Sequence, residues 1–208
     1  MKTILCYGDS NTWGYIPGTA SRYPRQVRWT GVLQNLLGEK FHVIEEGLNG
    51  RTTVMDDPTR IAKNGLPYLR PCLDSHAPID LVVLMLGTND TKHRFGLSAF
   101  DISEGVAMLV NIIQQSAAGL NNRAPAILLV SPVVLDPAPE KSALFEGAAQ
   151  KSRELAGHME NVAKANRCAF LDASLHTGVS PIDGIHLDEE GHQALGHAIA
   201  QKIQHLVG

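Results

Sequence analysis

Three residues near the two ends of the chain could together carry out nucleophilic chemistry on an acyl group. Ser10 follows a short apolar run, whereas Asp183 and His186 stand close together near the other end. A serine hydroxyl is a weak nucleophile until a base removes its proton, which a histidine can do near neutral pH. A carboxylate then orients the histidine ring and stabilises its protonated form. These residue types predict a serine–histidine–aspartate triad, provided that the fold brings the two ends together.

Two further polar turns could supply the hydrogen-bond donors that such chemistry needs. The oxyanion of a tetrahedral intermediate must meet donors, and the sequence offers the Ser10 amide, the Gly50 amide and the Asn89 side chain. Each turn alone is weak evidence, because polar turns that contain glycine are common in proteins. We base the prediction on their joint occurrence, each after a run that is typical of a strand.

Short apolar runs alternate along the chain with stretches of helical periodicity. The runs that predict buried strands are Thr3–Tyr7, Phe41–Glu45, Asp80–Leu86, Ala126–Val130 and Cys168–Leu171. Apolar residues at helical spacing predict helices within Thr30–Leu37, Val106–Ala117, Leu155–Ala163 and Leu195–Leu206. The run Asp80–Leu86 shows no polar alternation, which is typical of a central strand covered on both faces. Two stretches without clear periodicity, Ile16–Gln26 and Asp136–Leu144, predict loops.

Strands that alternate with helices indicate right-handed β-α-β crossovers and therefore a parallel sheet. We predict a single α/β domain over residues 1–208, a three-layer α/β/α sandwich whose central parallel sheet has about five strands. In such a sheet, ligands bind beyond the carboxyl ends of the strands. Ser10, Gly50 and Asn89 each follow a predicted strand, and Asp183 and His186 precede the last helix. The predicted fold therefore gathers the polar turns at one edge.

Composition excludes several classes of function. The chain of 208 residues has a net charge of −3 and no basic stretch, which argues against nucleic-acid binding. No segment approaches the roughly 18 apolar residues of a membrane span. The three cysteines, Cys6, Cys72 and Cys168, are odd in number and lack the spacing of a metal site. We therefore expect a reduced, cytoplasmic protein without a bound metal.

The polar turns together resemble the sequence blocks of the SGNH hydrolases, also called the GDSL family. The blocks read Gly8-Asp9-Ser10-Asn11, Asn49-Gly50-Arg51-Thr52, Gly87-Thr88-Asn89-Asp90 and Asp183-Gly184-Ile185-His186, so that they span nearly the whole chain. The stretches Ile4–Tyr15, Val43–Thr53 and Leu84–Lys92 are most similar to the bacterial arylesterase and acyltransferase branch of this family.

The resemblance implies a flavodoxin-like SGNH hydrolase fold and a role for each residue of the site. Ser10 would be the nucleophile, His186 the base and Asp183 the residue that orients it, while the Ser10 amide, the Gly50 amide and Asn89 Nδ2 would form the oxyanion hole. The implied activity is hydrolysis of short-chain or aryl carboxylic esters, with acyl transfer to alcohols or peroxide in some members. The implied partner is a small-molecule ester, no cofactor is implied, and a homo-oligomer remains open.

The substrate pocket is the least specified part of the prediction. Trp13 and Tyr15 could form a wall of an acyl pocket, and Val133 follows the fourth predicted strand at the same edge. For Val133, packing against a helix explains the residue nearly as well. Asn11 replaces the leucine that is usual in the family, and this polar side chain could line the site or cap the turn.

Two groups of alternatives remain open at the level of sequence. Within the same family, the protein could be a carbohydrate acetylesterase, a thioesterase or a lysophospholipase, although an aromatic content of 5% offers few side chains for stacking on sugars. In a different class, a flavodoxin-like module could bind a nucleotide through the turn Gly8–Thr12. The sequence lacks both glycine-rich nucleotide-binding motifs, which disfavours that module.

Overall fold

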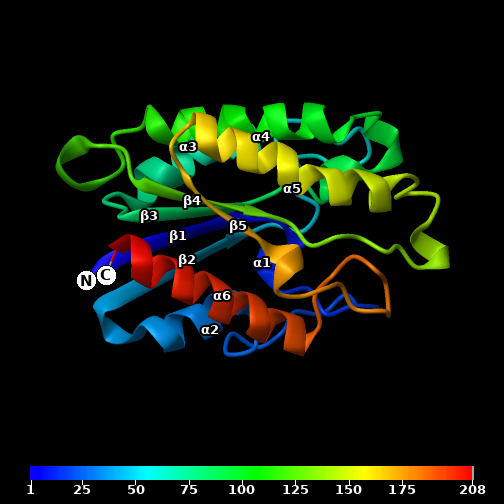
Figure 1. Cartoon of the computed structure of the whole chain (residues 1–208), viewed down its shortest axis with the longest axis horizontal. Helices are drawn as coiled ribbons and strands as arrows, with labels where there is room; N and C mark the ends of the chain where they lie inside the picture. The colour runs from blue at the N-terminus through cyan, green and yellow to red at the C-terminus, as the bar shows by residue number, and fades with distance from the viewer. Residues whose placement is uncertain (208) are drawn as a thin grey trace.

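Five short strands form one parallel sheet at the centre of the molecule (Figure 1). The computed structural model describes residues 1–207. The strands are β1 (Lys2–Gly8), β2 (Phe41–Gly47), β3 (Leu81–Met85), β4 (Ala126–Ser131) and β5 (Ala169–Asp172), in the spatial order β2-β1-β3-β4-β5. All five residues of β3 are buried, as the unbroken apolar run predicts for a central strand. The predicted sandwich fold is confirmed.

Helices cover both faces of the sheet because each strand presents apolar side chains on both sides. The helices α2 (Trp29–Leu37) and α6 (Glu189–Val207) pack on one face, where Ile4, Val83 and Ile199 share a core cluster. On the other face, drawn above the sheet in Figure 1, lie α3 (Gly65–His76), α4 (Ala99–Gln114) and α5 (Ala148–Ala165). The two core clusters therefore fix the sheet from both sides.

The helix α3 is the one long element that the sequence pattern does not predict. Its stretch contains Pro67 and Pro71, and a proline inside a helix removes a backbone donor and crowds the preceding turn. The helix begins nevertheless because the Asn64 side chain accepts a hydrogen bond from the Leu66 amide at 2.9 Å. Leu69, Cys72 and Leu73 are then buried against the sheet.

The register of the three strands on one side of the sheet sets the level of the turns that follow them. Gly8 at the end of β1 pairs with Gly47 of β2 and with Met85 of β3. The chain therefore leaves these three neighbouring strands at the same height. A four-residue helix, α1 (Ser10–Trp13), starts directly after β1 at this edge.

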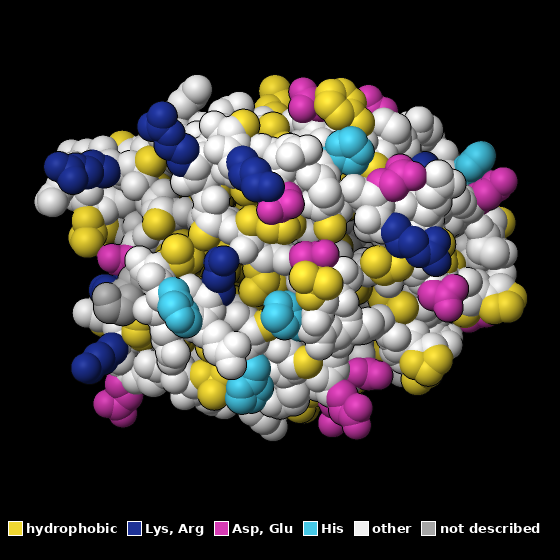
Figure 2. Space-filling model, in the orientation of Figure 1, with side chains coloured by type: hydrophobic (Ala, Val, Ile, Leu, Met, Phe, Trp, Pro, Cys, Tyr) yellow, Lys and Arg dark blue, Asp and Glu magenta, His cyan; other side chains and the backbone are white. Residues whose placement is uncertain are grey.

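The outer surface shows no concentration of one charge on the face drawn in Figure 2. Basic, acidic and apolar side chains are interspersed there over the helices. Within residues 1–207, no helix combines the length and the apolar character needed to cross a membrane.

The buried histidine of α6 should make the stability of the fold depend on pH. His192 is 0% exposed, and its Nδ1 accepts a hydrogen bond from the Trp29 amide at 3.2 Å. Burial lowers the pKa of His192 to about 4, although the charge of Asp188 partly opposes the shift. Between about pH 6.5 and 4, the unfolded chain thus binds a proton that the folded chain does not. The contribution of His192 to stability is complete above about pH 6.5 and is lost as the pH falls through 4.

We expect acidification from about pH 7 to 4.5 to remove about 2 to 3 kcal/mol of unfolding free energy through His192 alone. A His192→Gln variant keeps an acceptor but does not titrate in this range, so this part of the loss should disappear. Urea unfolding of both proteins at the two pH values measures the difference. An equal fall in the wild type and the variant would contradict the assignment.

Candidate active site

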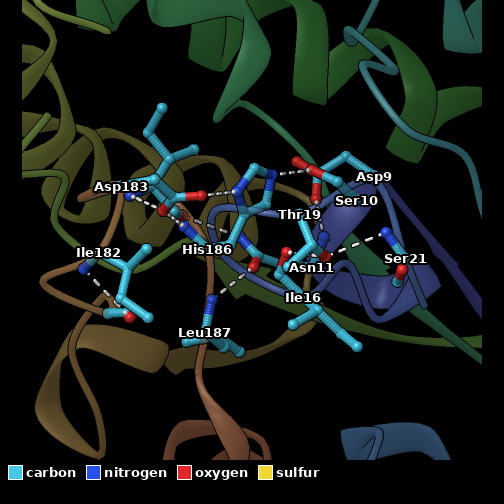
Figure 3. A network of polar contacts seen from close by, with 12 residues as sticks. Asp9, Ser10, Asn11, Ile16, Thr19, Ser21, Ile182, Asp183, His186 and Leu187 are labelled. Carbon is cyan, nitrogen blue, oxygen red and sulfur yellow. Dashed lines mark hydrogen bonds and ion pairs between the residues drawn. The ribbon is translucent and has the colours of Figure 1, made fainter. Parts of the chain in front are cut away.

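The structure brings Ser10 together with His186 and Asp183, although they lie far apart in the sequence, as Figure 3 shows. Ser10 is the first residue of α1, and its Oγ lies 3.0 Å from Nε2 of His186. Nδ1 of the same ring lies 2.7 Å from Oδ2 of Asp183. The ring of Tyr15 packs over the His186 ring, with centroids 4.3 Å apart. The hydroxyl, the imidazole and the carboxylate form one continuous hydrogen-bonded chain.

The carboxylate of Asp183 is held in its charged form. Its Oδ1 accepts hydrogen bonds from the amides of Ile185 and His186, each at 3.0 Å, while Oδ2 meets the His186 ring. Burial raises the pKa of Asp183, but the hydrogen bonds from His186 and Ile185 outweigh this effect and bring it to about 2. The imidazole therefore faces a negative charge at neutral pH.

The loop that carries Asp183 and His186 is shaped by a glycine and by a neighbouring loop. Gly184 has φ of +68°, and a Cβ atom at this position would lie 1.6 Å from the carbonyl oxygen of Asp136. The Gly184 carbonyl in turn accepts a hydrogen bond from the Asp136 amide at 2.9 Å. The segment 136–138, predicted as a loop, thus supports the triad loop directly.

Asn11 ties the nucleophile turn to the triad loop, and its prediction as a pocket residue is wrong. Its Oδ1 accepts from the Leu187 amide at 3.0 Å, and its Nδ2 donates to the Ile185 carbonyl at 3.3 Å. Both polar atoms of the side chain are hydrogen-bonded to these backbone groups, and the side chain is buried between the two turns. A leucine could not make these bonds, so the departure from the family pattern has a structural reason.

The three proposed oxyanion donors all line the cavity at Ser10. Across residues 1–207, neither the Ser10 amide nor the Gly50 amide donates to another protein group. One hydrogen of Asn89 Nδ2 goes to the Arg51 carbonyl at 3.1 Å, which fixes the amide plane and leaves the second hydrogen for a ligand. Arg51 itself is buried, with its guanidinium over the Tyr7 ring at 4.1 Å from the centroid. This packing supports the turn that carries Gly50.

The cavity has a volume of about 350 Å³ and contains both polar and apolar walls. Of the four predicted pocket residues, Tyr15 alone is among the lining residues. Trp13 lies under the guanidinium of Arg22, 4.9 Å from its ring centroid, and Val133 is buried in the core cluster beside α6. The predictions for Trp13 and Val133 are therefore wrong, because both side chains point into protein contacts instead of the cavity.

Most of the cavity wall comes from residues to which the sequence analysis gave no role. These lining residues are Asn49, Thr59, Arg60, Lys92, Arg94, Lys141, Leu144, Phe145 and Ile185. Asn49 and Ile185 belong to the second and fourth sequence blocks and Lys92 closely follows the third, so the blocks could have identified these three members of the set. A larger hollow of about 770 Å³ lies elsewhere, between α5 and α6, and none of the triad residues lines it.

A group of potential metal ligands occurs outside the cavity. The ligand atoms of Glu46, Cys72 and His76 lie within 4.8 Å of one another. Nε2 of His76 is already 2.8 Å from Oε1 of Glu46. Burial and the charge of Glu46 raise the pKa of the Cys72 thiol to about 12, so this thiol is protonated at neutral pH in the metal-free protein.

Comparisons with known proteins relate the chain to esterases. The sequence matches the GDSL-like lipase/acylhydrolase family over residues 6–194. The structure is similar to an aryl esterase from M. smegmatis, with 44% identity, a TM-score of 0.95 and coverage of 100% of each chain. It is also similar to a carbohydrate acetylesterase from Sinorhizobium meliloti, with 42% identity, a TM-score of 0.95 and coverage of 99% of this chain and 100% of the other. No curated protein matches the chain.

Proposed function

Because the chain belongs to the GDSL-like lipase/acylhydrolase family and is an SGNH esterase, similar to aryl and carbohydrate esterases, we propose that it cleaves short-chain or aryl esters through an acyl-enzyme on Ser10. In this proposal His186 is the general base and Asp183 orients it. The family membership also decides for an enzyme over the nucleotide-binding module considered above.

The reaction follows from the positions of the polar atoms. As Ser10 Oγ attacks the ester carbonyl, its proton moves to Nε2 of His186, and the charge of Asp183 stabilises the imidazolium. The Ser10 and Gly50 amides and Asn89 Nδ2 donate to the resulting oxyanion. When the intermediate collapses, the imidazolium protonates the leaving alcohol and the acyl group stays on Ser10. Water, activated by the same imidazole, then releases the acid.

The observation that carries the proposal is the 3.0 Å separation of Ser10 Oγ and His186 Nε2. An activated serine reacts with fluorophosphonates, whereas an ordinary surface serine does not. We expect one phosphonate adduct per chain, on the peptide that contains Ser10. Mass spectrometry of the digested protein locates it, and an adduct on another residue, or none, would contradict the proposal.

The size and lining of the cavity bear on the acyl group and on the acceptor that we propose. Leu144, Phe145 and Ile185 provide apolar walls around a volume of about 350 Å³. We infer that short acyl chains fit best and that an organic alcohol or peroxide can compete with water for the acyl-enzyme. A chain-length series of p-nitrophenyl esters, run with and without added alcohol, measures both properties.

A second candidate substrate class is acetylated carbohydrate, because the relative from Sinorhizobium meliloti is a carbohydrate acetylesterase at 42% identity. Of the aromatic residues, Tyr15 and Phe145 line the cavity and could contact a sugar ring. Rates on p-nitrophenyl acetate, acetylated xylose and an acyl thioester compare the two esterase classes with the thioesterase alternative.

We further propose that the protein is located in the cytoplasm, which is a reducing compartment. Whether it forms a homo-oligomer is a separate question. The three cysteines are free thiols in the structure, which is typical of proteins kept under reducing conditions. Size-exclusion chromatography with light scattering measures the oligomeric state.

A further inference from the structure

The cavity at Ser10 carries an excess of positive charge. Arg60, Lys92, Arg94 and Lys141 all line it, whereas no aspartate or glutamate of residues 1–207 does. The chain as a whole has 21 acidic and 18 basic side chains, so this local excess does not follow from its composition. A neutral ester would not need four cations around it.

One buried carboxylate holds two of these cations in place beside the cavity. Asp57 has a side chain that is 1% exposed, and its oxygens meet Arg60 Nε at 3.4 Å and Arg94 Nη1 at 3.1 Å. Asp57 also accepts hydrogen bonds from the amide and hydroxyl of Thr59, at 2.9 and 2.7 Å. The guanidinium groups are therefore oriented in advance, and Arg94 Nη1 also donates to the Thr59 hydroxyl. Within residues 1–207 their other N–H groups have no protein acceptor and can meet an anion.

The guanidinium of Arg60 lies directly against a proposed oxyanion donor. Gly50 has φ of +83°, and a Cβ atom built there would lie 2.2 Å from Nη2 of Arg60 and 2.7 Å from Nη1. A side chain at position 50 would displace the guanidinium. The guanidinium of Arg60 thus lies beside the residue whose amide is a proposed oxyanion donor.

Lys92 adds a cation that is largely removed from solvent. It is 3% exposed, and its Nζ lies 5.8 Å from the centroid of the Phe145 ring. In the part of the chain that the structure describes, no carboxylate forms an ion pair with it. Burial and the nearby charges of Arg60 and Arg94 together lower the pKa of Lys92 to about 8, while the charges of Asp57 and Asp9 partly oppose this shift. A buried cation among other cations would be stabilised by a bound anion.

From these contacts we propose that the cavity selects esters that carry a carboxylate, which Arg60, Arg94 and Lys92 bind while the ester carbonyl faces Ser10. A carboxylate is also the anion that Arg60 and Arg94 already hold, in the form of Asp57. This inference rests on the proposed esterase function and names the substrate class of the same site.

Matched pairs of esters test the proposal. For a carboxylate on the acyl side, the pair is mono-p-nitrophenyl adipate and its methyl ester; for the alcohol side, it is 4-acetoxybenzoate and methyl 4-acetoxybenzoate. We expect kcat/KM to be about tenfold or more higher for the charged member of at least one pair, which is the effect of a charge-assisted hydrogen bond. The pair that shows the preference identifies the side of the substrate that carries the carboxylate.

Substitutions of two cationic residues test whether these residues cause the preference for the charged ester. Arg60→Gln and Arg94→Gln should each lower the ratio of charged to neutral kcat/KM by about tenfold. Arg70→Gln removes a guanidinium that pairs with Asp74 on the surface of α3, and this control should leave the ratio unchanged. Raising the ionic strength should lower the ratio in the wild type, because salt screens the attraction.

Equal rates within both pairs, or a parallel loss on charged and neutral esters in both variants, would overturn the proposal. Hydrolysis of the neutral member of each pair requires the triad, whereas the preference for the charged member requires the cations as well. Hydrolysis of neutral esters without a preference therefore contradicts the carboxylate site alone. Failure to hydrolyse any ester contradicts the esterase function itself.

Discussion

Replacing Ser10 with alanine is expected to lower kcat for p-nitrophenyl acetate by about 10⁴–10⁶, as in other serine triads. The change removes the atom that forms the acyl bond, and no other hydroxyl of the described cavity residues lies within hydrogen-bond distance of His186. The remaining activity should come from the oxyanion donors and from binding alone. The measurement is the steady-state rate of p-nitrophenol release at saturating ester.

The fold should survive this substitution, which makes the result interpretable. Ser10 is 5% exposed, and among the described residues 1–207 its side chain bonds only to His186, so alanine leaves no other partner there without a hydrogen bond. Ser75→Ala on the exposed side of α3, where the hydroxyl bonds to the Cys72 carbonyl, is a matched control that should keep full activity. Retention of more than about a tenth of the wild-type rate by the Ser10 variant would exclude the acyl-enzyme mechanism.

The layers of the fold and the edge that carries the polar turns could be predicted from the sequence, because they depend on local patterns. Apolar runs such as Leu81–Met85 can be predicted as strands from their own residue types, without knowledge of distant contacts. Parallel connection then places the following turns at one edge. The positions of Ser10, Gly50 and Asn89 in the structure follow from these two steps and from the register of β1 with its neighbours.

The cavity wall could not be predicted, because it depends on contacts between segments distant in sequence. Asn11 meets the Ile185 carbonyl across a separation of 174 residues, and nothing near Asn11 in the sequence indicates this partner. Arg94 is likewise held by Asp57 across a separation of 37 residues, and Asp57 lies in a stretch without helical or strand periodicity. Val133 shows the reverse error, since its place after β4 indicates the edge but its side chain turns into the core.

The hydrogen bonds of Asp183 predict a second large loss of activity, in the variant Asp183→Asn. This substitution removes the negative charge of the side chain but nearly keeps its size. In Asp183→Asn, the amides of Ile185 and His186 still need an acceptor, so the single side-chain oxygen should stay with them. The new NH₂ group then faces Nδ1 of His186 and donates to it. The ring proton is forced onto Nε2, where the imidazole can no longer accept the proton of Ser10.

We therefore expect Asp183→Asn to lower kcat by about 10⁴ while the loop keeps its shape. The change of tautomer is visible in the ¹⁵N chemical shifts of the His186 ring, a signal that mere loosening of the loop would not produce. Asp188→Asn is the matched control, because Asp188 accepts from the Gly191 amide at 2.8 Å and asparagine can do the same. If Asp183→Asn lost less than about tenfold, or if its ring proton stayed on Nδ1, then the negative charge would not be what makes His186 a base for Ser10.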